Sequence, residues 1–177
     1  MELIEKHHKE GKTMGKRKKI LVASAWVLVF FITTLIAFAQ YRVDSETYRG
    51  WNHVKSMVIF DENHPLYNPF GGIHHVYANK EALDSVKQGE GRVFPDGSVL
   101  TFVLYEHVED NGAYLEGKKK IEAFMVKDSK KYKDTAGWGF FAYGADGKSI
   151  VKDMKNECFN CHAQVKSKDY VFSQWTQ

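Results

Sequence analysis

VLTFVLYEHV at residues 99–108 is followed by EDNG at residues 109–112 and by AYLEGKKKIEAFMVK at residues 113–127. The first segment is a long apolar and aromatic run, which is typical of a β-strand. Asn111-Gly112 supplies the positive φ angles that a tight hairpin turn needs. The third segment is therefore predicted to be the antiparallel return strand. It is interrupted by Gly117-Lys118-Lys119-Lys120, whose charge suits a solvated strand edge protected against pairing with another sheet.

The rest of the chain adds strands and short helices to this hairpin. Residues 73–78 and 137–143 are rich in β-branched and aromatic residues and predict strands, whereas residues 54–60 fit either a strand or a short helix. Asn79 is a good N-cap for a helix through Gln88, and a last helix is expected near residue 160. The pattern predicts an α+β, β-dominated fold: an antiparallel sheet with a few short helices. Residues 41–177 have room for one such domain.

Five residues near the end of the chain, Cys158-Phe159-Asn160-Cys161-His162, match the attachment motif of a c-type haem. The two thiols add to the two vinyl groups of the haem, so they must lie a porphyrin edge apart on one helical turn. The imidazole that follows then becomes the axial ligand of the iron. The chain has two cysteines, and the motif uses both. We therefore predict one covalent haem c per chain, held by Cys158 and Cys161 on a C-terminal helix and ligated by His162.

Three other structures could use the same two cysteines: a disulfide, a redox-active Cys-x-x-Cys pair, or half of a zinc site. A thioredoxin-like pair opens a helix after a strand of a βαβ unit, and the sequence shows no such pattern. A zinc site needs further ligands at metal spacing. His74 and His75 are the only other clustered histidines beyond the first residues.

Residues 20–39 form an uncharged, mostly apolar run that follows the basic stretch Lys16-Arg17-Lys18-Lys19. As a helix, the run would rise about 30 Å, which is enough to cross the hydrocarbon core of a bilayer. The basic stretch stays in the cytoplasm under the positive-inside rule, so the domain that follows is predicted to be periplasmic. Ala37-Phe38-Ala39 also fits a signal-peptidase site. The run is therefore either a retained inner-membrane anchor or a signal peptide cleaved near Ala39.

The net charge of the chain, +3, arises in its first residues. Residues 1–19, the predicted basic cytoplasmic segment, carry seven Lys or Arg and three Glu, which leaves −1 for the remainder. The net positive charge of the chain is therefore a feature of its predicted targeting segment. The exported domain has no basic, aromatic-interleaved stretch, so no nucleic-acid partner is expected.

Several stretches occur in order along the chain: Tyr48-Arg49-Gly50-Trp51, Ile73-His74-His75-Val76-Tyr77, Phe94-Pro95-Asp96-Gly97-Ser98-Val99, Val126-Lys127-Asp128-Ser129-Lys130-Lys131-Tyr132 with Gly137-Trp138-Gly139-Phe140, and Glu157-Cys158-Phe159-Asn160-Cys161-His162 with Lys168-Asp169-Tyr170-Val171-Phe172-Ser173. Together they resemble the cytochrome P-460 family, which includes hydroxylamine-oxidising haem enzymes and the β-sheet cytochromes c-prime. The resemblance implies a five-coordinate iron that is ligated by His162 and open to a small ligand on its other face. It also implies a homodimer built on antiparallel sheets.

In the hydroxylamine-oxidising members, a lysine side chain is also bonded to a meso carbon of the haem. Lys87, in Val86-Lys87-Gln88-Gly89, is the residue that the resemblance places at that position. The simpler alternative is a solvated lysine on a short helix.

Candidates for the open face of the iron are Phe140, Phe141 and Tyr143, whose rings would keep water away and admit diatomic gases. Ordinary core aromatics fit the same pattern. Hydroxylamine oxidation also needs a proton acceptor, for which Glu106 is the first candidate and Glu116 the second. His74 and His75 alternate on a strand, so one of them faces inward as a core residue or as a sixth iron ligand. The thioethers of Met57 and Met125 are further ligand candidates.

The leading hypothesis is an exported c-type haem protein that binds and oxidises hydroxylamine or nitric oxide. An electron-accepting cytochrome or similar redox partner would take the electrons. The second hypothesis is a non-catalytic, NO- or CO-binding cytochrome of the c-prime-beta kind. The third is a six-coordinate electron-transfer cytochrome.

Overall fold

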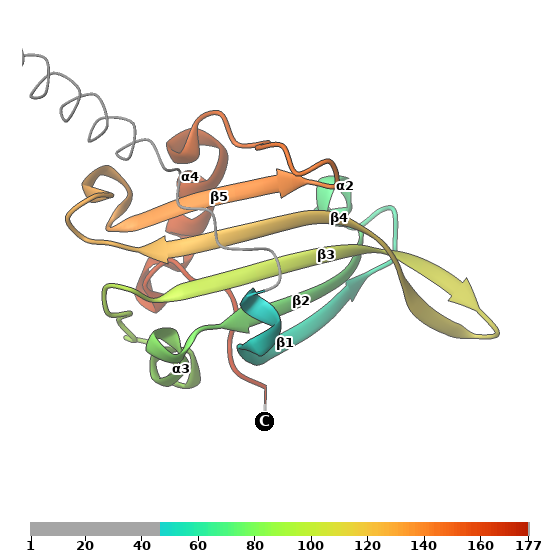
Figure 1. The fold of residues 1–177 in the computed structure, drawn as a ribbon, viewed down its shortest axis with the longest axis horizontal. Coiled ribbons are helices and arrows are strands. Elements are labelled where there is room, and N and C mark those ends of the chain that lie inside the picture. Colours follow the sequence, from blue (N-terminus) through green and yellow to red (C-terminus); the bar gives the residue numbers. More distant parts are fainter. Residues whose placement is uncertain (1–46, 177) are drawn as a thin grey trace, which may run out of the picture. The chain divides into compact units, whose positions relative to one another are not determined.

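The computed structural model describes residues 47–176, which lie in the compact unit Asp44–Gln177. Five strands form one antiparallel sheet whose spatial order follows the chain (Figure 1). The strands are β1 (Asn52–Ile59), β2 (Gly72–Ala78), β3 (Val99–Asp110), β4 (Ala113–Lys127) and β5 (Trp138–Gly144). The helices are all short: η1 (Thr47–Gly50), α2 (Tyr67–Phe70), α3 (Lys80–Lys87), η2 (Lys133–Thr135), η3 (Lys155–Phe159), α4 (Asn160–His162) and η4 (Ala163–Lys168). The predicted β-dominated α+β class is confirmed.

The β3–β4 hairpin forms where the sequence predicts it and extends beyond the other strands (Figure 1). Asn111 and Gly112 make the turn with φ angles of 51° and 80°. The expected interruption at residues 117–120 does not end β4; instead, the register against β3 shifts between Leu104 and His107. Because β5 pairs only with Ile121–Lys127, the lysines before it lie on a part of β4 that no described strand covers on that side.

Strand β1 precedes β2 in the chain, and helix α3 follows it. Residues 54–60, which fit two structures in the sequence, are mostly strand β1. Asn79 caps α3 as predicted: its Oδ1 accepts from the backbone N–H of Ala82 at 3.1 Å and from that of Val99 at 2.9 Å. The cap therefore ties α3 to β3 as well as satisfying the first turn of the helix.

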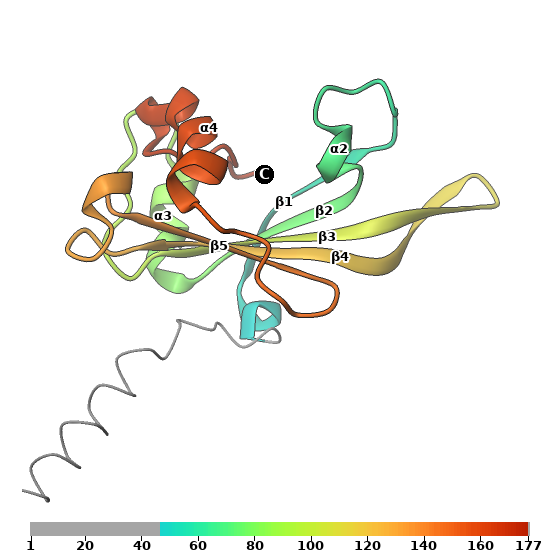
Figure 2. The same ribbon diagram turned by 90° about the horizontal axis from the view of Figure 1, so that it is seen from above.

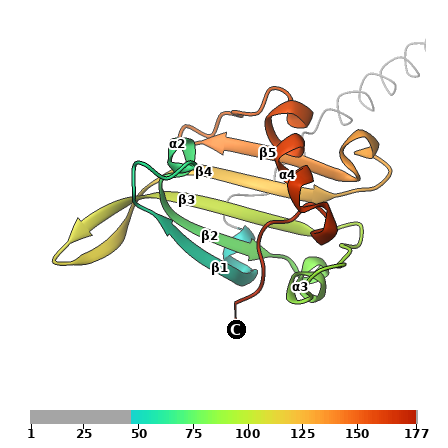
Figure 3. The same ribbon diagram turned by 180° about the vertical axis from the view of Figure 1, so that it is seen from behind.

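Helices α2 and α4 lie on the same side of the sheet, over opposite ends of its strands (Figures 2 and 3). The helix predicted to carry the cysteines is a succession of η3, α4 and η4. The main core lies on this side of the sheet, where α3 and the C-terminal tail cover the strands. It consists of Val54, Ala78, Ala82, Val86, Phe94, Leu100, Trp138, Phe140 and Val171.

The predicted membrane or signal segment, residues 20–39, lies outside the described residues. Within residues 47–176, no helix has the length and apolar character needed to span a membrane.

Candidate functional site

The two cysteines sit at the junction of η3 and α4 and form no disulfide with each other. Cys158 is half-buried and packs against the core, whereas Cys161 is exposed. Burial, and then the nearby charge of Glu157, raises the pKa of the Cys158 thiol. One thiol is thus anchored to the domain and the other is open to solvent.

His162 follows at the end of α4, and its ring is held between two aromatic rings. The ring centroids of Phe140 and Phe172 lie 4.9 and 5.1 Å from that of His162. Its Nδ1 donates to the backbone carbonyl of Tyr170 at 2.7 Å. Burial lowers the pKa of His162, which favours the neutral ring. Because a carbonyl can only accept, Nδ1 carries the proton and Nε2 keeps its lone pair for a metal.

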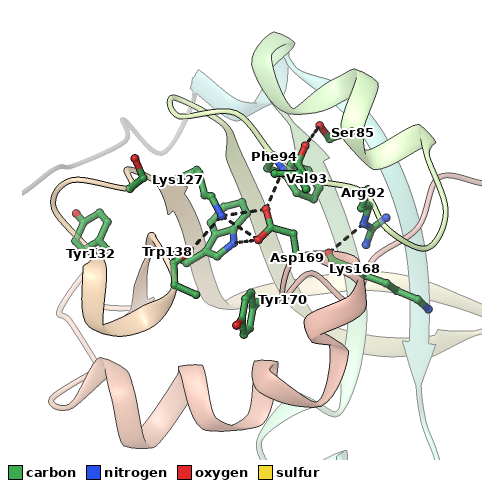
Figure 4. A network of polar contacts seen from close by, with 12 residues as sticks. Ser85, Arg92, Val93, Phe94, Lys127, Tyr132, Trp138, Lys168, Asp169 and Tyr170 are labelled. Atoms are coloured by element: carbon green, nitrogen blue, oxygen red, sulfur yellow. Dashed lines mark hydrogen bonds and ion pairs between the residues drawn. The ribbon is translucent and has the colours of Figure 1, made fainter.

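A buried polar network holds the backbone next to Tyr170 (Figure 4). The Nζ of Lys127 donates to both carboxylate oxygens of Asp169, at 2.9 and 3.0 Å. The backbone N–H of Phe94 donates to the same carboxylate at 2.8 Å, and the indole N–H of Trp138 at 3.4 Å. The side chains of Lys127 and Asp169 are 9% and 11% exposed, so water does little to screen this ion pair.

A second buried cation, Arg92, anchors the tail on either side of this network. Its guanidinium donates to the carbonyls of Lys168 at 3.2 Å and of Ser173 at 2.7 Å, and also to the carbonyl of Val171. Arg92 is 2% exposed. The segment that supplies the partner of His162 is therefore fixed to the sheet and to the loop after α3.

Between α4 and α2, one row of the sheet is left partly uncovered. The strand register places Val76, Phe102, Ala123 and Ala142 side by side across four strands. All four are half-buried, whereas Leu100 in the next row is buried by the core. We call these four residues the open strip. The open strip is apolar, and at Ala123 and Ala142 its side chains are short.

Helix α2 borders the far side of the open strip. Phe70 stacks edge-on against Phe102 with ring centroids 5.9 Å apart, and it is still 37% exposed. The Nε2 of His74 donates to the carbonyl of Phe70, and the Nζ of Lys120 donates to that of Gly71 at 2.7 Å. Two side chains of the sheet thus hold an aromatic ring over the strip.

These features fit a haem. The thiols and the free Nε2 of His162 are the three attachment groups that a c-type haem needs, and the open strip offers apolar surface for the macrocycle. The alternatives fit less well. No described group of three or more His, Cys, Asp or Glu residues is placed to hold a metal ion, and the sheet is antiparallel rather than βαβ.

The structure corrects the proposed set of distal aromatics. Phe140, Phe141 and Tyr143 are the sequence candidates for the open face, but neighbouring strand residues point to opposite faces, so the three do not share one side of the sheet. Phe140 contacts His162 itself, at 4.9 Å between centroids. Phe141 packs against Tyr132 and Tyr143 against Phe124, on the other face of the sheet. The aromatics at the open strip are Phe102, which is part of it, and Phe70, which packs on Phe102 from α2; sequence reasoning missed both.

The candidates for cross-linking and proton transfer lie apart from His162. The Nζ of Lys87 lies over the ring of Trp175, 5.1 Å from its centroid, at the exposed end of α3. Glu106 is exposed near the base of the hairpin, where it accepts from the backbone N–H of Lys118 at 3.4 Å. Within residues 47–176, no contact connects either candidate with the haem motif.

Glu116, the second proton-acceptor candidate, belongs to a polar cluster on the other face of the sheet. It accepts from the Nε2 of His75 at 2.6 Å, and the Nδ1 of His75 is bonded to the Oγ of Ser56 at 2.7 Å. The sheet therefore lies between this cluster and His162.

His74 and His75 face opposite sides of the sheet, as their alternation predicts. His74 is buried on the α2 side, and burial lowers its pKa; its Nδ1 is buried without a partner among the described residues. His75 faces the opposite side. Met57 is 46% exposed on β1, and Met125 packs against the core. Because the Nε2 of His74 donates to the carbonyl of Phe70, the nitrogen of this ring that keeps a lone pair is the buried Nδ1.

A family model described as Cytochrome P460 matches residues 45–173, well over half of the chain. Comparison with curated proteins gives no match. The matched region contains the whole sheet, both cysteines, His162 and the network of Asp169. The chain therefore belongs to the Cytochrome P460 family, whose members bind haem.

Proposed function

We propose that this chain is an exported c-type haem protein that binds and oxidises small nitrogen compounds such as hydroxylamine and nitric oxide at one open face of the iron. The observation that carries the proposal is an asymmetry of the site. One neutral imidazole with a free Nε2 lies on the α4 side, whereas the aromatic rings on the α2 side, Phe70 and Phe102, have no ligating atom. The imidazole of His74, whose ring lies 5.0 Å from that of Phe102, is 2% exposed and is tied through its Nε2 to the carbonyl of Phe70.

When bound, the haem supplies an iron that coordinates the small ligand and exchanges electrons with it. The chain's own residues would do the rest. Cys158 and Cys161 would attach the group through thioether bonds, and His162 would ligate it. Phe140, in contact with the imidazole, would help to fix its plane, and Phe70 with Phe102 would help to keep water away from a haem on the open strip.

The absorption spectrum of the exported, purified full chain tests this proposal. We expect a c-type pyridine haemochrome, a high-spin spectrum of the reduced protein, and a large shift of that spectrum on addition of CO. Low-spin spectra in both oxidation states without CO binding would instead support the electron-transfer alternative. In that case, His74→Phe and Met57→Leu would show which residue is the sixth ligand. Binding of NO without turnover of hydroxylamine would support the c-prime-beta alternative.

The oxidase form of the proposal makes a covalent prediction for Lys87. Tryptic digestion should leave Lys87 on the haem-bearing peptide, because the family's cross-link joins a lysine to the macrocycle. The side chain would have to leave Trp175 to do so. Lys87→Arg should release a free peptide and abolish hydroxylamine turnover, whereas Lys80→Arg, at the exposed start of α3, should change neither. A wild-type Lys87 peptide free of haem would remove the main support for oxidation.

Two partners belong to the proposal. Oxidation needs an electron acceptor such as another cytochrome, because the electrons must leave the haem after each turnover. A homodimer is the second, and exposed apolar side chains near the β3–β4 hairpin would suit it. Phe60 stacks on Tyr114 there at 5.7 Å, and Val108 and Leu115 are about half exposed, at 47% and 48%.

A further inference from the structure

The carbonyl that accepts from His162 is held in a backbone conformation that its residues do not favour. Asp169 and Tyr170 have φ angles of 50° and 65°, in the left-handed region. Non-glycine residues pay on the order of 1 kcal/mol each for this conformation. Two such residues in succession persist only where the surroundings hold them. Their backbone N–H groups bond to the carbonyls of Lys166 and Val165, at 3.0 and 3.1 Å, as in a helix C-cap, and tertiary contacts add to this local support.

The tertiary contacts that support this backbone conformation converge on the Asp169 carboxylate. Lys127, Trp138 and the backbone N–H of Phe94 bind its two oxygens from three different segments (Figure 4). Lys127 itself is oriented by the Trp138 ring, 4.8 Å from its Nζ, and by the carbonyl of Ala136 at 3.3 Å. The carboxylate is thus fixed along several directions at once.

Arg92 and Asp169 act on different parts of the tail. The guanidinium of Arg92 binds the carbonyls of Lys168, Val171 and Ser173, which flank the left-handed pair. Among the described tail carbonyls, those of Asp169 and Tyr170 receive nothing from Arg92. Arg92 therefore secures the tail as a whole, whereas the Asp169 network, together with the backbone bonds to Lys166 and Val165, holds the left-handed pair between its contacts.

We propose that Asp169 and Lys127 are positioning residues that set the reduction potential of the haem. They hold the Tyr170 carbonyl against the Nδ1–H of His162. A hydrogen bond at this nitrogen makes the imidazole a stronger electron donor to the metal. A stronger donor stabilises the oxidised iron and lowers the potential. This inference rests on the proposed function, because it takes His162 as the axial ligand.

The test compares Asp169→Ala with wild type in the haem-loaded full chain, by spectroelectrochemical titration and by resonance Raman spectroscopy of the reduced protein. We expect the midpoint potential of Asp169→Ala to rise and its iron–histidine stretching frequency to fall. Asp169→Asn, which keeps a side-chain oxygen and tolerates the left-handed region, should shift both in the same direction but less.

Asp96→Ala is the matched control. Asp96 also orders backbone with its carboxylate, accepting from the N–H of Ser129 at 2.8 Å and from its hydroxyl at 2.7 Å. Within residues 47–176, Asp96 forms no hydrogen bond or ion pair with the tail. Any general loosening of the domain should therefore appear in both alanine variants, whereas the potential and the Raman band should move only in Asp169→Ala.

Equal potentials and Raman bands in Asp169→Ala and Asp96→Ala would overturn the inference. If Asp169→Ala does not accumulate, the same measurements are made on Asp169→Asn and Lys127→Met. A wild-type midpoint potential and Raman band in both of these variants would also overturn the inference. A wild-type protein without a c-type haemochrome would instead refute the proposed function. A midpoint titration can be made whether the iron has one axial ligand or two, so the comparison of variants remains decisive if the Raman band is absent.

Discussion

Serine in place of both Cys158 and Cys161 should abolish the covalent haem completely. Each serine differs from cysteine by one atom, but its hydroxyl does not form the thioether to a haem vinyl group. The expected result is loss of haem staining in denaturing gels and loss of the c-type pyridine haemochrome. His162 would still offer its Nε2, so weak, dissociable haem binding to the folded chain is compatible with this expectation.

The single variants Cys158→Ser and Cys161→Ser should differ in stability. Each keeps one thioether, so haem should remain on the denatured chain at reduced yield. Cys158 packs against the core and Cys161 is exposed, so Cys158→Ser should be the less stable of the two. Asn160→Ser, at an exposed position between them, is the control and should keep wild-type haem content. Haem that stays on the denatured double variant would contradict the attachment.

Lys127→Met should cause a large loss of stability. The substitution removes the only cation bound to the Asp169 carboxylate among the described residues and leaves that carboxylate buried. Breaking a buried pair in this way costs about 3–5 kcal/mol, because the remaining charge keeps its desolvation penalty. We expect the free energy of unfolding, measured by urea denaturation with circular dichroism, to fall by about that amount.

The double variant Lys127→Met/Asp169→Asn should recover most of this loss. Both charges are then absent, and replacing a whole buried pair is often close to neutral. Lys131→Met, on the same β4–β5 connection but exposed, should change the unfolding free energy by less than about 0.5 kcal/mol. Additive losses in the double variant would show that the two side chains are not coupled, and would also weaken the positioning role argued above.

The elements that the sequence predicts well are those with local causes. Asn111-Gly112 turns the hairpin because these two residues accept positive φ angles, whatever surrounds them. Asn79 starts α3 because its side chain reaches its own first turn. The haem motif is also local, since two thiols and an imidazole within five residues are a complete attachment site.

The aromatic residues around the predicted haem site could not be predicted from such local patterns. Alternation shows that Phe140 and Phe141 point in opposite directions, but only the position of α4 decides which of them meets His162. Phe70 lies in a Pro- and Gly-rich stretch that reads as a loop, and the hydrogen bond from His74 and the ring of Phe102 place it beside the open strip. Each of these contacts joins residues of two different elements, so no pattern within a single element predicts it.

By itself, the sequence determined the β-dominated class, the hairpin, the helix capped by Asn79 and the three residues that would hold a haem. These follow from backbone preferences and covalent chemistry, which act over a few residues. Only the tertiary structure decided which aromatics face the open strip and how His162 is oriented. The reason is distance along the chain: Lys127 and Asp169 are 42 residues apart, and their ion pair forms only when β4 and the tail are packed together.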